Sequence, residues 1–268
     1  MDIGSRGAGP KLERPRLRPR AGLAAGLGEP LQPFFATAAV PCPYIAGRAE
    51  RKLIVELSGG EAAAFYDDLS RAGFRRSHRF AYRPACGACE ACVPVRIAVE
   101  RFAHSRSTRR VRNLNRALTG TLMPARATQE QYRLFQEYQR SRHRDSEMAE
   151  MTYGDYRAMV EDTPVRTATV EFRDGPLDQG GRLIAATLLD RLDDGLSAVY
   201  NFYAPDVERQ SLGTWGILWL VEECQRRALP YVYLGYWIAQ APKMAYKGRF
   251  PALERLGPDG WIPIAEQG

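Results

Sequence analysis

The sequence predicts an α+β fold, in which a small Cys-containing N-terminal α/β domain is followed by a larger domain. In the first part, the spacing of apolar residues is typical of strands and of one helix, and a cluster of cysteines lies among them. In the second part, two helices precede three strands joined by short turns, and a strand–loop–helix–strand unit comes last. We place the boundaries at 1–30 for a disordered Arg/Pro/Gly-rich tail, 31–118 for the first domain and 119–268 for the second.

Composition limits the class of protein. The chain has 268 residues, 45% of them hydrophobic, which is enough to bury a sizeable core. No run approaches the roughly 18 apolar residues that span a bilayer, and the N-terminus lacks the apolar region of a secretory signal. We therefore expect a cytoplasmic location. In that reducing compartment the five cysteines do not indicate a disulfide framework, and packing, metal binding or chemistry must explain them.

In the first domain we expect one helix that runs to about residue 72. Ser58 is its expected N-cap, and Gly73 lies just past its end. Alternation of apolar and polar residues predicts strands at 51–57, 74–82 and 93–99.

Three cysteines lie between the last two of these strands. Cys86, Cys89 and Cys92 form a double C-x-x-C, and Cys42 is the candidate for a fourth ligand. Thiolates at this spacing can converge on a zinc ion or an iron–sulfur cluster. The alternatives are small buried residues at a tight turn or the vestige of a metal site. Cys224 lies within an apolar helical run, and we expect it in the core.

An arginine-rich segment follows the third strand. Between residues 96 and 116 there are seven Arg and one acid, Glu100. On a helix that starts at Ser107, the side chains of Arg109, Arg112 and Arg116 share one face. Such a face suits contacts with phosphates, and the alternative is a solvated charged surface.

The second domain contains the expected order of helix, helix, three strands, helix and strand. Thr128–Gln131 has the form of a capping box at the first helix. The expected elements are 129–143, 152–160, 165–172, 182–190, 196–203, 215–228 and 231–236. This is the order of an N-acetyltransferase-like (GNAT) N-acyltransferase domain. In that fold the strands on either side of the long helix splay apart, and the gap admits a thioester or ester donor.

The loop 210–214 opens the long helix. Free backbone N–H groups and the positive end of the helix dipole meet there, which favours a phosphate or an acyl carbonyl. Among the histidines, His143 is the best candidate for a catalytic base, although ordinary hydrogen-bonded histidines are more common. The sequence has no G-x-S-x-G elbow and no recognisable catalytic triad.

Several longer motifs resemble one family, the bacterial aminoacyl-tRNA–protein transferases of the aspartate/glutamate leucyltransferase type, which are related to eukaryotic arginyl-tRNA–protein transferase. They spread from about residue 33 to the C-terminus, at 41–48, 82–97, 105–107, 194–200, 211–214, 233–238 and 243–247. The sequence departs from the family pattern at 143–148, where Arg-Asp-Ser-Glu-Met follows His143, and at 44–47, which reads Tyr-Ile-Ala-Gly. These loops bear on substrate preference more than on reaction class.

The resemblance implies an enzyme that transfers leucine from leucyl-tRNA to the α-amine of proteins beginning with Asp or Glu. The product is a degradation signal of the N-degron pathway. The donor ester is already activated, so no cofactor is required for the chemistry. The acceptor α-amine has a pKa near 8, and catalysis can rest mostly on positioning. The expected partners are leucyl-tRNA and acidic protein N-termini, without a membrane, and the oligomeric state is left open.

Site residues are assigned as hypotheses on this basis. The proposed catalytic residues are Tyr203, Ser211, Gly213 and Tyr236. The proposed aminoacyl-tRNA contacts are Gln210, Leu212, Thr214, Arg109, Arg112 and Arg116. The proposed contacts to the acidic acceptor are Arg83, Arg96, Lys243 and Lys247.

Three alternatives stay open. The donor could be arginyl-tRNA in place of leucyl-tRNA. The chain could be an acyl-CoA N-acetyltransferase, although a CoA donor does not require the arginine-rich segment. It could also be a non-catalytic, metal-stabilised RNA-binding protein, which would not need the strand–loop–helix–strand unit.

Overall fold

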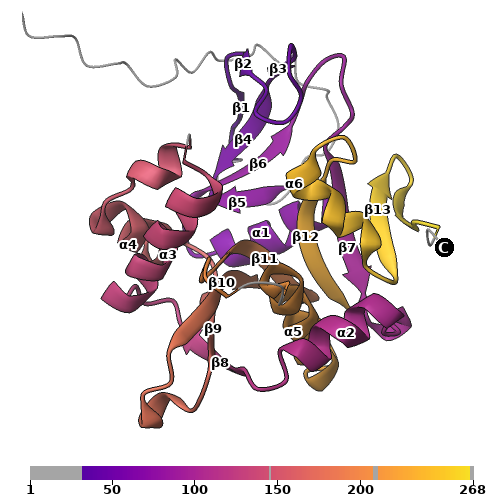
Figure 1. Cartoon of the computed structure of the whole chain (residues 1–268). Helices are drawn as coiled ribbons and strands as arrows, with labels where there is room; N and C mark the ends of the chain where they lie inside the picture. The colour runs from indigo at the N-terminus through magenta and orange to yellow at the C-terminus, as the bar shows by residue number, and fades with distance from the viewer. Residues whose placement is uncertain (1–31, 145, 208–210, 266–268) are drawn as a thin grey trace, which may run out of the picture.

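The computed structural model describes residues 32–144, 146–207 and 211–265 (Figure 1). The expected N-terminal tail and Gln210 therefore lie outside the described residues. The described chain has a mixed α/β fold around one large mixed sheet. In order across it, the strands are β14 (Gly260–Pro263), β13 (Leu253–Gly257), β7 (Val93–Ala98), β12 (Tyr231–Trp237), β11 (Gly195–Tyr203), β10 (Leu183–Arg191), β9 (Thr167–Arg173) and β8 (Thr119–Pro124).

Two smaller sheets are built from the N-terminal part. One has the order β1 (Phe34–Ala36), β4 (Lys52–Glu56), β6 (Phe80–Pro84) and β5 (Arg75–Ser77), and the other pairs β2 (Val40–Pro41) with β3 (Ala49–Glu50). The strand expected at 74–82 is thus a hairpin, which turns at His78 with φ +53°.

Helix α1 (Ala62–Arg71) packs Tyr66 and Leu69 into a buried cluster with the small sheet. Its N-cap is Glu61, and not Ser58 as expected. Gly73 follows the helix with φ +83°, as its position in the sequence predicts.

The other helices largely follow the sequence-based expectation. Thr128 and Thr152 each close a capping box, at α3 (Gln129–Arg142) and α4 (Tyr153–Glu161). Helix α2 (Arg106–Leu114) is capped by Ser105, whose side chain accepts a hydrogen bond from the Thr108 backbone N–H. The remaining described helices are α5 (Leu212–Arg226), α6 (Pro242–Ala245), η1 (Val99–Arg101), η2 (Glu147–Glu150), η3 (Leu177–Gln179) and η4 (Tyr246–Arg249).

Helices cover both faces of the large sheet. Side chains of β10 point to the two faces and pack against different helices. Ala186 and Leu188 point into the cluster formed with α3 and α4. Ala185 and Leu189 point into the cluster formed with α5. In Figure 1, α3 and α4 lie on one side of the molecule, with α5 and α2 on the other.

Strand β7 joins the N-terminal part to the large sheet. Ile97 pairs with Val232 of β12 on one side and with Leu253 of β13 on the other. The domain boundaries expected from the sequence place this strand in the first domain. A separate Cys-rich domain is therefore not evident in the described residues. The elements expected from the sequence do not include strand β8, which lies at one edge of the large sheet.

In the described residues no helix is both long and apolar enough to cross a membrane.

Candidate active site

The candidate site lies where β11 and β12 part. The two strands pair in parallel at residues 195–197 and 231–233 and do not pair beyond them. Arg75 of β5 bridges the opening. Its Nη2 donates to the carbonyl oxygens of Ala198 (2.7 Å) and Val199 (2.9 Å) on β11, and its Nη1 donates to Leu234 O (3.3 Å) on β12. The carbonyls exposed by the divergence are thus bound by a guanidinium from the small sheet.

Gly235 makes room for this guanidinium. Its φ is +68°, and a Cβ added there would lie 2.0 Å from Arg75 Nη1. Both the backbone angle and the close approach require glycine at this position.

Lys247 of η4 binds backbone carbonyls of β12 at the same opening. Its side chain is buried, and its Nζ donates to Leu234 O at 2.8 Å and Tyr236 O at 2.9 Å. Burial, together with the nearby Arg75 charge, lowers the pKa of Lys247 well below its ordinary value.

A cavity of about 560 Å³ opens onto these groups. Its exposed end is formed by residues from the end of α3, the loop after it and α6, and its buried end by β10, β11, β12 and α5. The cationic side chains that line it are those of Arg75, Arg142, Arg144 and Lys243, beside the buried amine of Lys247. The cavity is therefore suited to anionic groups.

His143 lies among these cations. Its Nδ1 is 3.3 Å from Lys243 Nζ, and burial, with Lys243 and Arg142 nearby, lowers the pKa of His143 from its ordinary 6.5. The imidazole is then neutral near pH 7 and able to accept a proton.

The buried end of the cavity carries two polar atoms. Thr187 and Asn201 face each other across β10 and β11, and both line the cavity. Thr187 Oγ1 and Asn201 Oδ1 are buried and have no hydrogen-bond partner among the described residues. Gly216 of α5 leaves space for them, since a Cβ there would lie 2.4 Å from Asn201 Nδ2. Two buried acceptors at the end of a cavity suit the N–H groups of a ligand.

The predicted loop residues lie beside this cavity. Ser211 is the N-cap of α5 in a left-handed conformation (φ 52°, ψ 45°) without a side-chain capping bond. Ser211 and Thr214 line a smaller cavity of about 170 Å³, to which Tyr246 also contributes. Tyr246 lines the larger cavity as well and so connects the two. Leu212 is buried in the core around α5.

Tyr203 and Gly213 are neighbours next to the cavity wall. A Cβ on Gly213 would lie 3.6 Å from the Tyr203 ring, an ordinary contact. The Tyr203 ring packs edge-on against Tyr138, at 4.9 Å between centroids, and Tyr138 lines the cavity.

Three predicted residues have other partners. The Tyr236 hydroxyl is 3.0 Å from the carbonyl oxygens of both Gly73 and Tyr82, so it joins the two sheets. Arg96 is buried, pairs with Glu254 and stacks over aromatic rings. Arg83 donates to the carbonyl of Ala72. None of these three side chains is among the lining residues of the cavity.

The basic helix α2 presents an arginine surface. Arg109 and Arg116 line an open hollow of about 750 Å³, together with Arg106 and Arg110. Arg112 instead pairs with Glu222 of α5 at 3.1 Å. The three arginines assigned to tRNA therefore divide into two that line the hollow and one that holds the helix to its neighbour.

The four cysteines Cys42, Cys86, Cys89 and Cys92 are neighbours. Burial raises the pKa of Cys92 to about 11, with further contributions from the other three thiols. In the part of the chain that the structure describes, no three Cys, His, Asp or Glu side chains are arranged to hold a metal ion. Zinc or iron–sulfur binding at these thiols stays a prediction.

Sequence reasoning missed Arg75, Arg142, Arg144, Thr187 and Asn201. The run of basic residues around His143 was a usable signal for Arg142 and Arg144. Arg75, Thr187 and Asn201 gave no local signal, because their roles depend on strands far away in the sequence.

Comparison with known proteins shows the family to which this chain belongs. Residues 40–110 match the family model described as arginine-tRNA-protein transferase, N terminus, and residues 130–257 match the model of its C terminus. The chain belongs to the arginine-tRNA-protein transferase family and is an aminoacyltransferase.

The relatives narrow this class. An aspartate/glutamate leucyltransferase of Paramagnetospirillum magneticum is 56% identical over 87% of this chain and 93% of its own length. One from Rhodospirillum rubrum is 52% identical over 88% and 94%. Among solved structures, L-PGS from Bacillus licheniformis aligns with a TM-score of 0.40 and 11% identity, over 69% of this chain and 54% of that chain.

Proposed function

We propose that this chain transfers leucine from leucyl-tRNA to the α-amine of proteins that begin with Asp or Glu. The observation that carries the proposal is the cationic cavity at the divergence of β11 and β12. An acidic first residue is a ligand that such a cavity attracts. The relatives that share half or more of the sequence have the corresponding name.

The acceptor carboxylate has three cations at the exposed end of the cavity. Arg142, Arg144 and Lys243 are exposed, and all three line the cavity. Lys247 and Arg75 are committed to backbone carbonyls and are better suited to fix the shape of the buried end.

The donor approaches from the side of α2 and α5. The Arg109 and Arg116 side chains suit the phosphates of the tRNA. Residues 212–214 form the first turn of α5, where backbone N–H groups lack helical partners and favour a developing oxyanion. The buried acceptors Thr187 Oγ1 and Asn201 Oδ1 suit the N–H groups of an amine.

The chemistry is aminolysis of an ester. The acceptor nitrogen forms a bond to the leucyl carbonyl carbon, and the bond from that carbon to the ribose oxygen breaks. The nitrogen loses a proton, and the released ribose oxygen gains one and becomes a hydroxyl. We assign the proton transfer to His143, whose pKa is lowered by burial and by Lys243 and Arg142.

We retain the GNAT-like description as part of the proposal, since antiparallel strands, a divergence and a long helix occur in the expected order. Arg75 argues against the acyl-CoA alternative. It occupies the carbonyls of Ala198 and Val199 that an extended donor would pair with in the opening. Because charged tRNA and newly exposed N-termini occur in the cytoplasm, we place the reaction there, as a step in N-degron degradation.

One assay tests the proposal. Separately charged leucyl- and arginyl-tRNA are incubated with peptides that begin with Asp, Glu or Lys. We expect labelled leucine on the Asp and Glu peptides. Transfer of arginine in preference to leucine would replace the donor, and tRNA binding without any transfer would favour the RNA-binding alternative.

A charge reversal tests the acceptor side of the cavity. Lys243→Glu should reduce the preference for Asp over Lys at the acceptor terminus. Arg83→Glu is the matched comparison, because Arg83 is absent from the cavity lining and donates to Ala72 O. An unchanged preference in Lys243→Glu, or an equal effect in both variants, would refute the assignment.

A further inference from the structure

The cavity continues into two others. A cavity of about 820 Å³ shares six lining residues with it, namely Tyr44, Arg75, Met148, Val199, Tyr200 and Met244. This second cavity shares Ser77, His78 and Tyr82 with a third one of about 860 Å³. The three cavities therefore adjoin in series, from His143 and Lys243 to the outer face of the β5–β6 hairpin, and we call this series the path.

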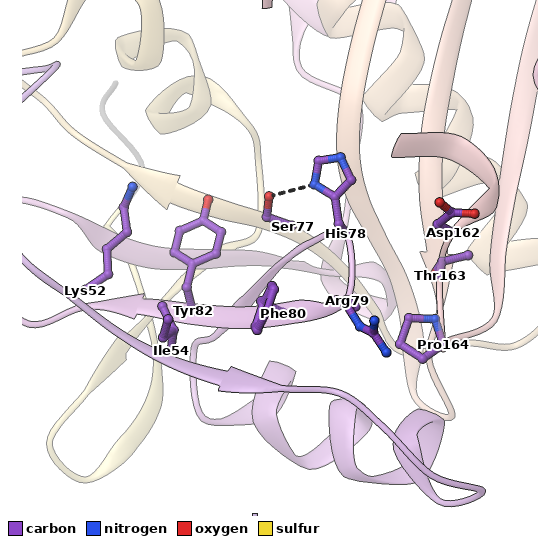
Figure 2. Close-up of a pocket in the computed structure, with 10 residues that line it drawn as sticks. All are labelled: Lys52, Ile54, Ser77, His78, Arg79, Phe80, Tyr82, Asp162, Thr163 and Pro164. Carbon is purple, nitrogen blue, oxygen red and sulfur yellow. Dashed lines mark hydrogen bonds between the residues drawn. The ribbon is translucent and has the colours of Figure 1, made fainter. Parts of the chain in front are cut away.

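Figure 2 shows the far end of this path. The side chains of Ile54, Phe80 and Tyr82 lie between Lys52 on one side and the turn 162–164 on the other. Phe80 is 40% exposed and lies beside Ile54 and Tyr82 in this lining. The surface is thus largely apolar and open to an extended chain.

Charge along the path differs from that of the cavity at the divergence of β11 and β12. Carboxylates of Glu147, Glu150 and Asp155 line the middle cavity, and Asp162 lines the outer one. The two arginines of the middle cavity, Arg75 and Arg76, are already bound to backbone carbonyls and to Asp190. The outer cations already have partners, since Lys52 pairs with Glu50 at 2.8 Å and Arg79 with Glu56 at 3.1 Å. This lining repels a phosphate backbone and tolerates a polypeptide.

We propose that this path holds the residues that follow the acidic first residue of the acceptor protein. The inference rests on the proposed function, because a protein acceptor can present its terminus at His143 only if the rest of its chain can leave the cavity. The apolar surface around Phe80 binds the acceptor chain a few residues beyond its terminus. The carboxylates of Glu147, Glu150 and Asp155, which line the middle cavity, favour basic residues of the acceptor over acidic ones at that point.

Acceptor length tests the proposal. The chain is assayed with leucyl-tRNA and Asp-initiated peptides of two and six residues. We expect kcat/KM to be roughly tenfold higher for the hexapeptide, equivalent to ~1.4 kcal/mol of additional binding. Phe80→Ser should bring the hexapeptide value close to that of the dipeptide. Ile262→Ser is the matched control, because Ile262 is 37% exposed on β14 and is absent from the path.

The acidic stretch is tested with two hexapeptides that carry Lys or Glu after the first residue. The chain should prefer the Lys peptide, and Glu150→Lys should weaken or reverse that preference. The path is refuted if both peptide lengths react equally in the wild-type chain. It is also refuted if Phe80→Ser raises the KM for tRNA and leaves the effect of peptide length as it was. Absence of transfer to every peptide would instead refute the proposed function.

Discussion

Single residues at the divergence of β11 and β12 decide whether the opening keeps its shape. Arg75 donates to carbonyls of both strands, and Lys247 donates to two carbonyls of β12. Glycine at 235 allows the close approach of Arg75. A side chain added at this point acts on the site through Arg75 and not through a substrate.

Gly235→Ala should therefore displace Arg75. The positive φ and the close contact should cost about 1–3 kcal/mol of stability, and we expect kcat/KM to fall by at least about tenfold, or ~1.4 kcal/mol. Thermal unfolding and transfer rates measure the two effects. Gly60→Ala is the control, because an added Cβ there meets no atom within 4 Å among the described residues beyond its two chain neighbours. A Gly235→Ala variant with normal activity would show that Arg75 does not shape the site.

His143 should appear in the pH dependence of kcat/KM for the acceptor. The pKa of His143 is lowered from 6.5, so the base stays neutral down to that lower pH and is lost by protonation below it. The acceptor amine must also be neutral to react, and its pKa is about 8. It therefore adds a second rise in kcat/KM at higher pH, near pH 8. We expect His143→Gln to remove the lower limb and to slow transfer by about 10²–10⁴-fold. A lower limb that persists in His143→Gln would assign it to another group.

At the scale of elements, helix α2 combines two roles. Arg112 pairs with Glu222 of α5, whereas Arg109 and Arg116 line the open hollow. One helix thus offers both a test position and a matched control.

Arg109→Ala and Arg116→Ala should each raise the KM for tRNA. Each should also reduce the slope of log KM against log salt by about 0.7–0.9, the effect of losing one phosphate contact. Arg112→Ala should change this slope less. Titrations between low and moderate salt measure it, and equal slopes for all three variants would contradict the division.

The cysteine loops allow a direct measurement. If the predicted metal site exists, elemental analysis of protein purified without oxygen should find zinc or iron, and Cys86→Ser should lose it. Because burial and its neighbours raise the pKa of Cys92 to about 11, a bound cation would have to lower that pKa. Equal metal content in the wild-type protein and in Cys86→Ser would refute the prediction.

Many of the helices and strands could be predicted from the sequence. The caps Thr128 and Thr152, the strands that flank α5 and the basic helix all carry local signals. The hairpin turn at His78 has no glycine to mark it. Arg75 and Tyr236 could not be understood locally, since both bind backbone carbonyls that belong to distant segments.

At the scale of the whole molecule, a buried ion pair joins the small sheet to the large one. Arg76 donates from Nε and Nη2 to the two carboxylate oxygens of Asp190, each at 2.8 Å. Their side chains are 1% and 0% exposed. Thr167 donates to the same carboxylate. The connection between the sheets, and so the place of Arg75 next to Arg76, depends on this pair.

Asp190→Asn should leave the Arg76 charge buried without its counter-charge. We expect a loss of about 3–5 kcal/mol of unfolding free energy, measured by denaturant titration. Arg79→Gln removes one partner of an exposed pair with Glu56 and should cost at most about 1 kcal/mol. Similar losses in both variants would contradict the structural role of the buried pair.

The position of β7 between β12 and β13 also affects how the chain is made. Its core residues Val95 and Ile97 are 1% and 0% exposed in the finished fold. Both neighbouring strands, at 231–237 and 253–257, come much later in the sequence than β7, so they leave the ribosome long after it does. Until then β7 is an unpaired apolar strand, the kind of segment that promotes aggregation and binds chaperones. The enzyme thus completes its central sheet only after residues 231–257 have been synthesised.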